Sequence, residues 1–335
     1  MSETANADII QVAVIVACGG RGARFRSGAG GSSEVGSSEA GSGAIGAGAV
    51  GSNEVGSNEV GSGAAGSNAA GVGAAGSNEV GSGAAGSRAA GVGDEGVPEK
   101  QFCEIAGKPV LSYTLDTLER HPRIAKVVLV LPMEALGRGE ALVKGQWGAA
   151  ARAGAVSGPG ADRHADSGDL DNPVPGPYRK VSDIVAGGND RQESVANGLA
   201  ALAASGWRGP VLVHDGVRPL ASARVYDRVI EGTVSRGNAV AAIPLRDTIK
   251  RADGNRVVSQ TLPREGLWQI QTPQGFWIDQ LIDAYDEGKK RGLKVTDDAS
   301  LLEALGYKVH LVDGDPINIK MTYKEDMEIL KALLI

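Results

Sequence analysis

The feature that most constrains the fold of this chain is a glycine-led pentapeptide repeat. From Gly31 it runs as GSSEV, GSSEA, GSGAI, GAGAV, GSNEV and onward, until GVGDE and GVPEK merge with the next motif. A period of five matches neither the 3.6 of a helix nor the 2 of a strand. Because glycine also makes ordering entropically costly, we expect a disordered or loosely extended loop at residues 26–96. A partner-binding strap or lid and a short glycine-rich solenoid are the alternatives.

The repeat also holds most of the charge of the chain. Residues 26–96 contain seven acidic residues and two arginines, a net of −5 out of −6 for all 335 residues. The remainder is therefore almost neutral, which argues against a broad basic surface for nucleic-acid phosphates. We expect a local anion pocket and a small anionic substrate instead.

The amino terminus and the cysteine content indicate a cytoplasmic protein. Residues 1–20 lack the positive segment of a secretory signal, and their apolar run is too short to span a bilayer. Cys18 and Cys103 are the only cysteines, and there are four histidines. This composition supports neither a disulfide framework nor a zinc site, so we expect reduced thiols and no membrane association.

Strand-like and helix-like segments alternate outside the repeat and outside a second polar segment, 133–178, which is typical of a surface loop. Strands are expected at 9–17, 126–131, 211–214, 239–243 and 308–312, and helices at 110–118, 190–204, 223–231, 278–287, 297–305 and 323–334. This alternation predicts a single α/β domain over 1–335, a mostly parallel twisted sheet flanked by helices. Such sheets bind ligands at the carboxyl ends of their strands.

The first strand leads into a loop of small residues, CGGRGARF. Gly20 and Gly22 let backbone N–H groups approach a polyphosphate, and Arg24 adds a fork of donors. The loop lacks the third glycine of a dinucleotide fingerprint and the Gly-Lys-Ser/Thr of a P-loop, so neither a nicotinamide enzyme nor a P-loop enzyme is predicted. We interpret Cys18, which begins this loop, as a small packing residue and not as a nucleophile.

Further motifs follow the repeat in a characteristic order. They are PEKQF at 98–102, IAGKPVL at 105–111, GGNDRQESV at 187–195, HDGVRP at 214–219, DTIK at 247–250, LW at 267–268, TPQ at 272–274, TDDAS at 296–300 and NIK at 318–320. The series resembles that of the 2-C-methyl-D-erythritol 4-phosphate cytidylyltransferases, members of the sugar-phosphate nucleotidyltransferases. Apart from the two insertions, the resemblance covers essentially the whole chain.

The resemblance implies transfer of the CMP moiety of CTP to 2-C-methyl-D-erythritol 4-phosphate, with release of pyrophosphate. The second pKa of a phosphate monoester is about 6, so the attacking oxygen is already mostly ionised at neutral pH without a protein base. Cations and backbone donors should therefore dominate the site, because they position two polyanions and stabilise the developing charge.

Five residues carry the main roles implied by the resemblance. Arg24 and Lys100 would stabilise the transition state at the triphosphate. Arg264 and Lys320 would position the methylerythritol phosphate. Asp215, which ends a predicted strand, would hold a Mg²⁺ ion that bridges phosphate oxygens. Without the other motifs, these residues would be ordinary surface cations and a turn or cap aspartate.

Other contacts with nucleotide or acceptor are implied at glycines and polar side chains, namely Gly20, Gly22, Gly188, Asn189, Ser194, Arg218, Thr248, Thr272 and Thr296. A threonine hydroxyl can donate to a phosphate or polyol oxygen. Asn189 and Thr296 are equally suited to cap the helices that follow them, and both roles stay open.

The resemblance further implies an arm at 246–264 that crosses to a second subunit. Thr248 and Arg264 would then serve the site of the neighbour, and the enzyme would be a homodimer. No cyclodiphosphate synthase domain is expected after the last helix. Two alternatives remain: a cytidylyltransferase for another polyol phosphate such as ribitol 5-phosphate, and a non-catalytic scaffold that presents the repeat.

Overall fold

The computed structural model describes residues 10–18, 99–148 and 176–335, all in one of the two units of the chain. The predicted loop at 26–96 lies outside these residues, as do Gly20, Gly22 and Arg24. The assignment of the whole chain to a single domain therefore stays a prediction. Within the described residues, no helix combines the length and apolar composition needed to cross a bilayer.

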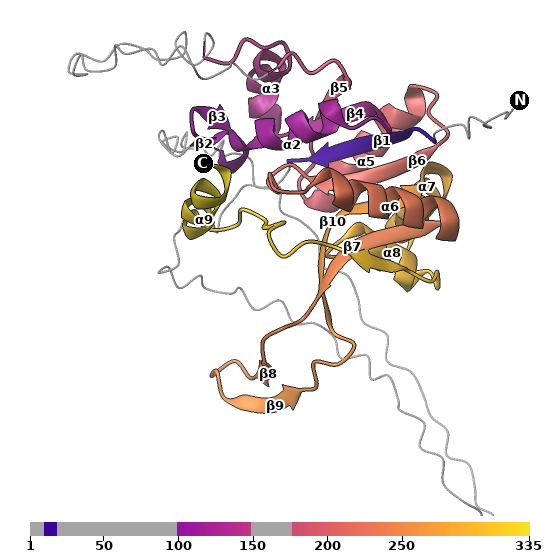
Figure 1. Cartoon of the computed structure of the whole chain (residues 1–335). Helices are drawn as coiled ribbons and strands as arrows, with labels where there is room; N and C mark the ends of the chain where they lie inside the picture. Colours follow the sequence, from indigo (N-terminus) through magenta and orange to yellow (C-terminus); the bar gives the residue numbers. More distant parts are fainter. Residues whose placement is uncertain (1–9, 19–98, 149–175) are drawn as a thin grey trace, which may run out of the picture. The chain divides into compact units, whose positions relative to one another are not determined.

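A seven-stranded sheet forms the centre of the described structure (Figure 1). Its strands, in spatial order, are β11 (Leu311–Asp313), β7 (Asn238–Pro244), β10 (Trp268–Trp277), β6 (Pro210–Asp215), β1 (Val12–Ala17), β4 (Ile124–Leu131) and β5 (Val181–Ala186). β10 runs antiparallel to both of its neighbours, and the other pairs are parallel. The prediction of a mostly parallel sheet is confirmed.

Helices cover both faces of this sheet (Figure 1). They are α2 (Val110–Arg120), α3 (Leu136–Val143), α5 (Arg191–Ala204), α6 (Ala223–Arg236), α7 (Ile278–Lys290), α8 (Asp298–Ala304) and α9 (Lys324–Leu334). On β1, Val14 and Val16 pack with α2, α3 and α6, whereas Ile15 packs with α5, α7 and α8. Alternate side chains of one strand thus enter two cores, which explains the unbroken apolar run.

A smaller core fixes the last helix. Leu330 of α9 and the preceding Met321 pack with Val110 and Val217. Three short elements precede Val110 in the sequence: η1 (Lys100–Phe102), β2 (Glu104–Ile105) and β3 (Lys108–Pro109). Ile105 of β2 belongs to the same small core. This packing brings the carboxyl-terminal segment against the turn that follows β6.

The prediction of a surface loop at 133–178 is wrong for its first part. Met133–Ala135 forms the 3-10 helix η2, and α3 follows directly. Leu142 of α3 is fully buried in the core, and Tyr178 at the far end of the segment is also buried. Two glycines in α3 concealed the helix from sequence inspection, because glycine weakens helix propensity. Residues 149–175 lie outside the described structure.

A hairpin leaves the sheet between β7 and β10 (Figure 1). Its strands β8 (Ile249–Ala252) and β9 (Val258–Leu262) pair with each other in an antiparallel two-stranded sheet separate from the main one. Nearly every side chain in it is exposed. A two-stranded hairpin of this kind has no core of its own.

Candidate active site

Asp215, the last residue of β6, is the centre of a buried cluster of charges. Its side chain is 7% exposed and forms ion pairs with Lys320 Nζ at 3.0 Å, Arg218 Nε at 3.2 Å and Arg191 Nε at 3.6 Å. Burial alone would raise the pKa of Asp215, but the three cations hold it well below its ordinary value. The carboxylate is therefore ionised at neutral pH.

Backbone and amide contacts hold two of these cations in place. Arg218 Nη1 donates to the carbonyl oxygen of Asn318 at 2.8 Å, and the side-chain amide of Asn318 donates to the carbonyl oxygen of Thr272 at 2.9 Å. Beside Lys320, the N–H of Met321 donates to the carbonyl oxygen of Val217 at 2.9 Å. The NIK segment is thus tied to the turn after β6 and to β10.

Thr272 faces the same carboxylate from β10. Its hydroxyl oxygen accepts a hydrogen bond from the N–H of Asp215 at 3.0 Å and lies 3.1 Å from Nδ1 of His214. His214 is completely buried, and this burial lowers its pKa to about 3. The imidazole is therefore neutral at physiological pH and forms a fixed part of the wall.

The amino end of α8 forms the opposite wall. Asp297 is the N-cap of this helix: its carboxylate accepts from the N–H of Ser300 at 3.2 Å and from the hydroxyl of the same residue. Gln274 of β10 donates to Asp297 at 2.6 Å and accepts from the N–H of Ala299 at 3.1 Å. The interpretation of Thr296 as the cap is wrong, because Asp297 takes that position.

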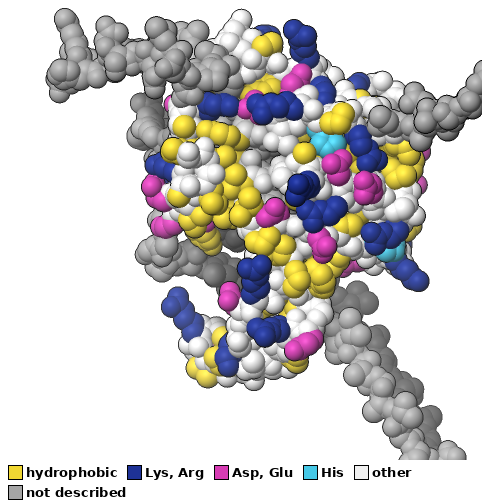
Figure 2. Space-filling view, viewed as in Figure 1, with side chains coloured by type: hydrophobic (Ala, Val, Ile, Leu, Met, Phe, Trp, Pro, Cys, Tyr) yellow, Lys and Arg dark blue, Asp and Glu magenta, His cyan; other side chains and the backbone are white. Residues whose placement is uncertain are grey.

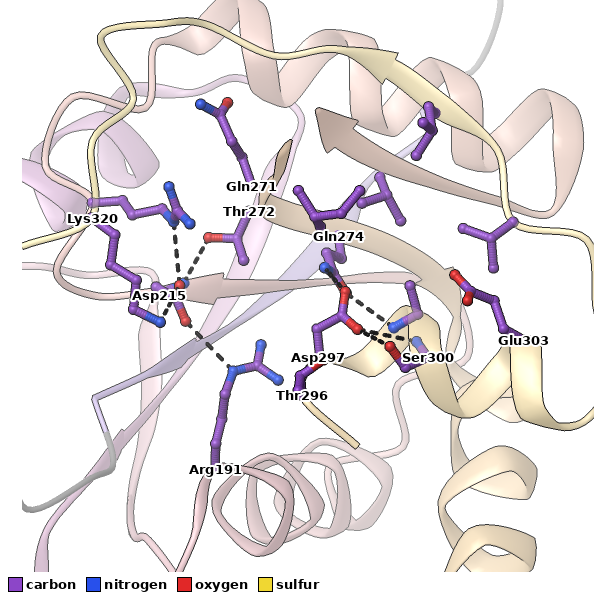
Figure 3. A pocket seen from close by; sticks show the side chains of 16 residues that line it. Arg191, Asp215, Gln271, Thr272, Gln274, Thr296, Asp297, Ser300, Glu303 and Lys320 are labelled. Atoms are coloured by element: carbon purple, nitrogen blue, oxygen red, sulfur yellow. Dashed lines mark hydrogen bonds and ion pairs between the residues drawn. The ribbon is translucent and has the colours of Figure 1, made fainter. Parts of the chain in front are cut away.

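Between these walls lies a pocket of about 390 Å³ (Figure 3). Five of the residues predicted from the sequence line it: Asp215, Arg218, Thr272, Thr296 and Lys320. They come from β6, the turn after it, β10, the segment before α8 and the segment before α9. The carboxyl end of the parallel sheet therefore brings together residues that lie more than a hundred positions apart.

Lys100 begins η1 and does not line this pocket in the described part of the chain. The charges of Lys100 and Asp215 both affect the pKa of the Cys18 thiol, which places Lys100 near the end of β1. Burial raises the pKa of Cys18 to about 12, with Lys100 opposing the shift. The thiol is therefore protonated, as expected of a packing residue.

Gly188 and Asn189 lie in the turn between β5 and α5, and Ser194 in the first turns of α5 contacts this turn. The hydroxyl of Ser194 accepts from the N–H of Gly188 at 3.0 Å and donates to the carbonyl oxygen of Asp190 at 2.7 Å. Both the backbone N–H and the side-chain amide of Asn189 donate to Glu193. Asp190, and not Asn189, is the N-cap of α5. These three residues lie outside the 390 Å³ pocket.

Thr248 and Arg264 lie on the exposed hairpin and do not reach the pocket. The guanidinium of Arg264 donates to the carbonyl oxygen of Arg246 at 2.8 Å, which ties the base of the hairpin together.

Sequence inspection missed the contributions of Arg191, Gln274 and Asn318. All three lie inside motifs that had been recognised, but their roles depend on contacts across the fold. Arg191 gave the clearest signal of the three, since an arginine in the first turn of a predicted helix, inside a recognised motif, is a candidate ion-pair partner.

Comparison with known proteins identifies the family. The family model described as IspD, 2-C-methyl-D-erythritol 4-phosphate cytidylyltransferase, matches residues 163–335. The cytidylyltransferase of that name from Halalkalibacterium halodurans is 36% identical over 235 residues, which cover 70% of this chain and 88% of the relative. The chain belongs to this family.

Other relatives agree with that assignment. The cytidylyltransferase of Geotalea uraniireducens is also 36% identical, over 70% of this chain and 88% of its own length. The crystal structure of the enzyme from Thermus thermophilus superposes with a TM-score of 0.52 at 30% identity, over 70% of this chain and 93% of that one. A structure titled 4-diphosphocytidyl-2C-methyl-D-erythritol synthase gives 0.55 at 30% identity, over 71% and 94%. The predicted resemblance to the cytidylyltransferase family is confirmed.

Proposed function

We propose that this chain transfers the cytidylyl group of CTP to 2-C-methyl-D-erythritol 4-phosphate and releases pyrophosphate. The observation that carries this proposal is the ionised Asp215, which lines a pocket together with Lys320 and Arg218, in a chain 36% identical to relatives of that name. A pocket rich in fixed cations suits two phosphorylated substrates.

The reaction requires positioning and charge stabilisation more than proton transfer. An oxygen of the acceptor phosphate attacks the α-phosphorus of CTP, the new O–P bond forms, and the bond to the β-phosphate breaks. Lys320 is 36% exposed while its ammonium group contacts Asp215, so the same group can reach a bound phosphate. Lys100 and Arg24 would add positive charge on the side of the triphosphate.

Asp215 fits a role in holding Mg²⁺. This cation commonly takes one or two protein carboxylates and completes its shell with substrate phosphates and water. The Asp215 carboxylate is ionised and lines the pocket, as a ligand to such an ion would have to be. When bound, Mg²⁺ would neutralise charge on the phosphates.

We further propose that the arm completes the site of a second copy. Thr248 and Arg264 are exposed and distant from the pocket of their own chain. Val257 and Val258 at the hairpin are 61% and 54% exposed, and Trp268 and Ile270 near its base are 39% and 41% exposed. Figure 2 shows hydrophobic and basic side chains on this arm, at the bottom of the view. Such exposed apolar residues favour a homodimer contact.

The remaining assignments concern location and partners. We infer a cytoplasmic enzyme that acts on small molecules and binds no nucleic acid. On the face drawn in Figure 2, acidic and basic side chains are interspersed, which does not favour a polyanion-binding surface.

Pyrophosphate release tests the proposed reaction directly. The full-length chain is assayed with each of four nucleoside triphosphates and with either methylerythritol phosphate or ribitol 5-phosphate. We expect turnover with CTP and methylerythritol phosphate. Activity with ribitol 5-phosphate alone would instead identify a different polyol phosphate cytidylyltransferase.

Removal of residues 26–96 tests the scaffold alternative. We expect the shortened chain to keep its turnover, because the cost of closing a loop changes only logarithmically with its length. If neither the full-length nor the shortened chain releases pyrophosphate, the non-catalytic scaffold becomes the better explanation.

A further inference from the structure

Arg191 connects a carboxylate that lines the pocket, Asp215, with one that is buried behind it, Asp298. Its Nε lies 3.6 Å from Oδ1 of Asp215, at the end of β6. Its Nη2 lies 2.6 Å from Oδ2 of Asp298, the first residue of α8. In Figure 3, Arg191 rises from α5 with its guanidinium between Asp215 and the segment of Thr296. One planar group therefore links the end of β6 to the first residue of α8.

The contact on the α8 side is firmly anchored. The carboxylate of Asp298 is completely buried and also accepts a hydrogen bond from the hydroxyl of Tyr285 on α7. Thr296, which lines the pocket, lies only two residues before Asp298. A buried residue behind the pocket thus holds the Arg191 guanidinium, and the same guanidinium contacts Asp215, which lines the pocket.

We propose that Arg191 is a positioning residue that couples Asp215 to the amino end of α8, and so fixes the spacing across the pocket between the end of β6 and the segment of Thr296. This proposal rests on the proposed function and adds a residue to its machinery. Because Arg191 uses different nitrogens for the two carboxylates, its planar fork is required, and the single charge of a lysine cannot replace it.

The test compares Arg191→Lys with Gln192→Ala. Gln192 is a matched control: it lies next to Arg191 on α5 and ties this helix to the carbonyl oxygen of Leu293 at 3.3 Å, outside the pocket. We expect Arg191→Lys to lower kcat about 10- to 100-fold with little change in KM for CTP, because a displacement of about 1 Å in a positioned group has effects of this size. Gln192→Ala should keep the kcat of the wild type.

Two results would overturn the coupling. If Arg191→Lys retains wild-type kcat, a positive charge alone is sufficient. If it raises KM for CTP while kcat is unchanged, Arg191 only contributes uniform binding of the nucleotide.

The double variant Arg191→Gln/Asp298→Asn guards against misfolding, because it removes both members of the buried ion pair together. We expect this folded double variant to lose kcat as Arg191→Lys does, and wild-type kcat in it would equally reject the proposal.

A second measurement does not depend on the reaction. The N–H groups of Ala299 and Ser300 are bonded at the amino end of α8 and report on its order. We expect their hydrogen exchange to become at least about tenfold faster in Arg191→Lys, as local opening becomes easier, and to be unchanged in Gln192→Ala. Unchanged exchange in Arg191→Lys would reject the coupling. Absence of pyrophosphate release by the wild type would reject the proposed function only, and the exchange data would still decide the role of Arg191.

Discussion

Asp215 and Lys320 lie at the end of a sheet covered by helices on both faces, whereas Thr248 and Arg264 lie on a two-stranded hairpin exposed almost throughout. The first pair is in contact, with 3.0 Å between the ammonium nitrogen and a carboxylate oxygen. Neither residue of the second pair lines the pocket, and the guanidinium of Arg264 donates to the carbonyl oxygen of Arg246 at the base of its own hairpin.

This difference concerns how each region fixes the geometry of its side chains. At the sheet end, buried neighbours determine where a charge lies, because an unpaired buried charge is costly. On the arm, solvent can satisfy every polar group. Packing within the same chain therefore does not fix the positions of the Thr248 and Arg264 side chains. We therefore expect the sheet end to act within one chain and the arm to act across two.

The largest expected effect is that of Lys320→Ala at the sheet end. Loss of this cation should lower kcat/KM by about 10²–10³-fold, since removal of one preorganised group that stabilises transition-state charge has effects of this order. Steady-state pyrophosphate release with CTP and methylerythritol phosphate measures it.

Lys324→Gln is the control for this variant. Lys324 begins α9, four residues further along, is exposed and does not line the pocket. Its replacement should leave kcat/KM within about twofold, as is usual for surface substitutions. Equal losses in both variants would show that general surface charge, and not the geometry of the sheet end, drives the reaction.

Mixing two inactive chains tests the arm. Lys320→Ala and Arg264→Ala should each be impaired alone, the second by about 10- to 100-fold if it positions the acceptor. In a mixed dimer, one site receives an intact Lys320 from one chain and an intact Arg264 from the other. Random pairing of equal amounts should therefore restore about a quarter of wild-type activity, because half of the dimers are mixed and each has one complete site.

The outcome distinguishes two arrangements of the arm. Recovery on mixing, followed by loss when subunit exchange is prevented, fits an arm that serves the neighbouring chain. No recovery in a preparation shown by sedimentation to contain dimers would mean that Arg264 serves its own pocket.

A smaller effect concerns the pH dependence of stability. Burial lowers the pKa of His214 to about 3 in the folded chain, whereas the unfolded chain has the ordinary value near 6.5. The unfolded state then binds more protons between these values, so stability is present above pH 6.5 and is lost as the pH falls toward 3. Between pH 7 and pH 4 we expect a loss on the order of 2–3 kcal/mol from this residue.

Denaturant unfolding at a series of pH values, compared between wild type and His214→Asn, measures this contribution. The variant should show a shallower decline with acid, even though it is less stable at pH 7. A chain without residues 247–263 should retain the wild-type decline, because His214 belongs to the sheet end. If removal of the arm abolished the acid sensitivity, the separation of the two regions would be incorrect.

The sheet end was largely predictable from the sequence, whereas several supports around it were not. The unbroken apolar run before Cys18 and the VLVHD run that ends in Asp215 identified the central strands. β10 was missed because it contains Pro273 and Gly275 and runs antiparallel to its neighbours, with an irregular register between Ile270 and Gln274. Local patterns do not report such a strand.

Long-range ion pairs were equally hidden. The contact between Arg191 and Asp298 joins residues 107 positions apart, and only the packing of α5 beside α7 and α8 brings them together. Motif order located Asp215, Thr272, Thr296 and Lys320 through family resemblance, but no local signal shows which arginine spans the two walls. The arm was recognised for the same reason, but no local pattern shows which positions it would contact in the proposed dimer.

The smallest expected effect is that of Cys18→Ala, which tests whether a buried residue at the sheet end is thereby functional. The pKa of Cys18, raised by burial to about 12, keeps the thiol protonated and poorly nucleophilic. An added Cβ at Gly216 would lie 2.4 Å from the sulfur, so the thiol fills tightly packed space.

We expect kcat of Cys18→Ala to change by less than about twofold and its stability to fall by about 1 kcal/mol, as for loss of one small buried group. A kcat more than about tenfold lower in a variant of normal stability would assign the thiol a chemical role. Unchanged kcat would show that a buried position at the sheet end does not by itself make a residue functional.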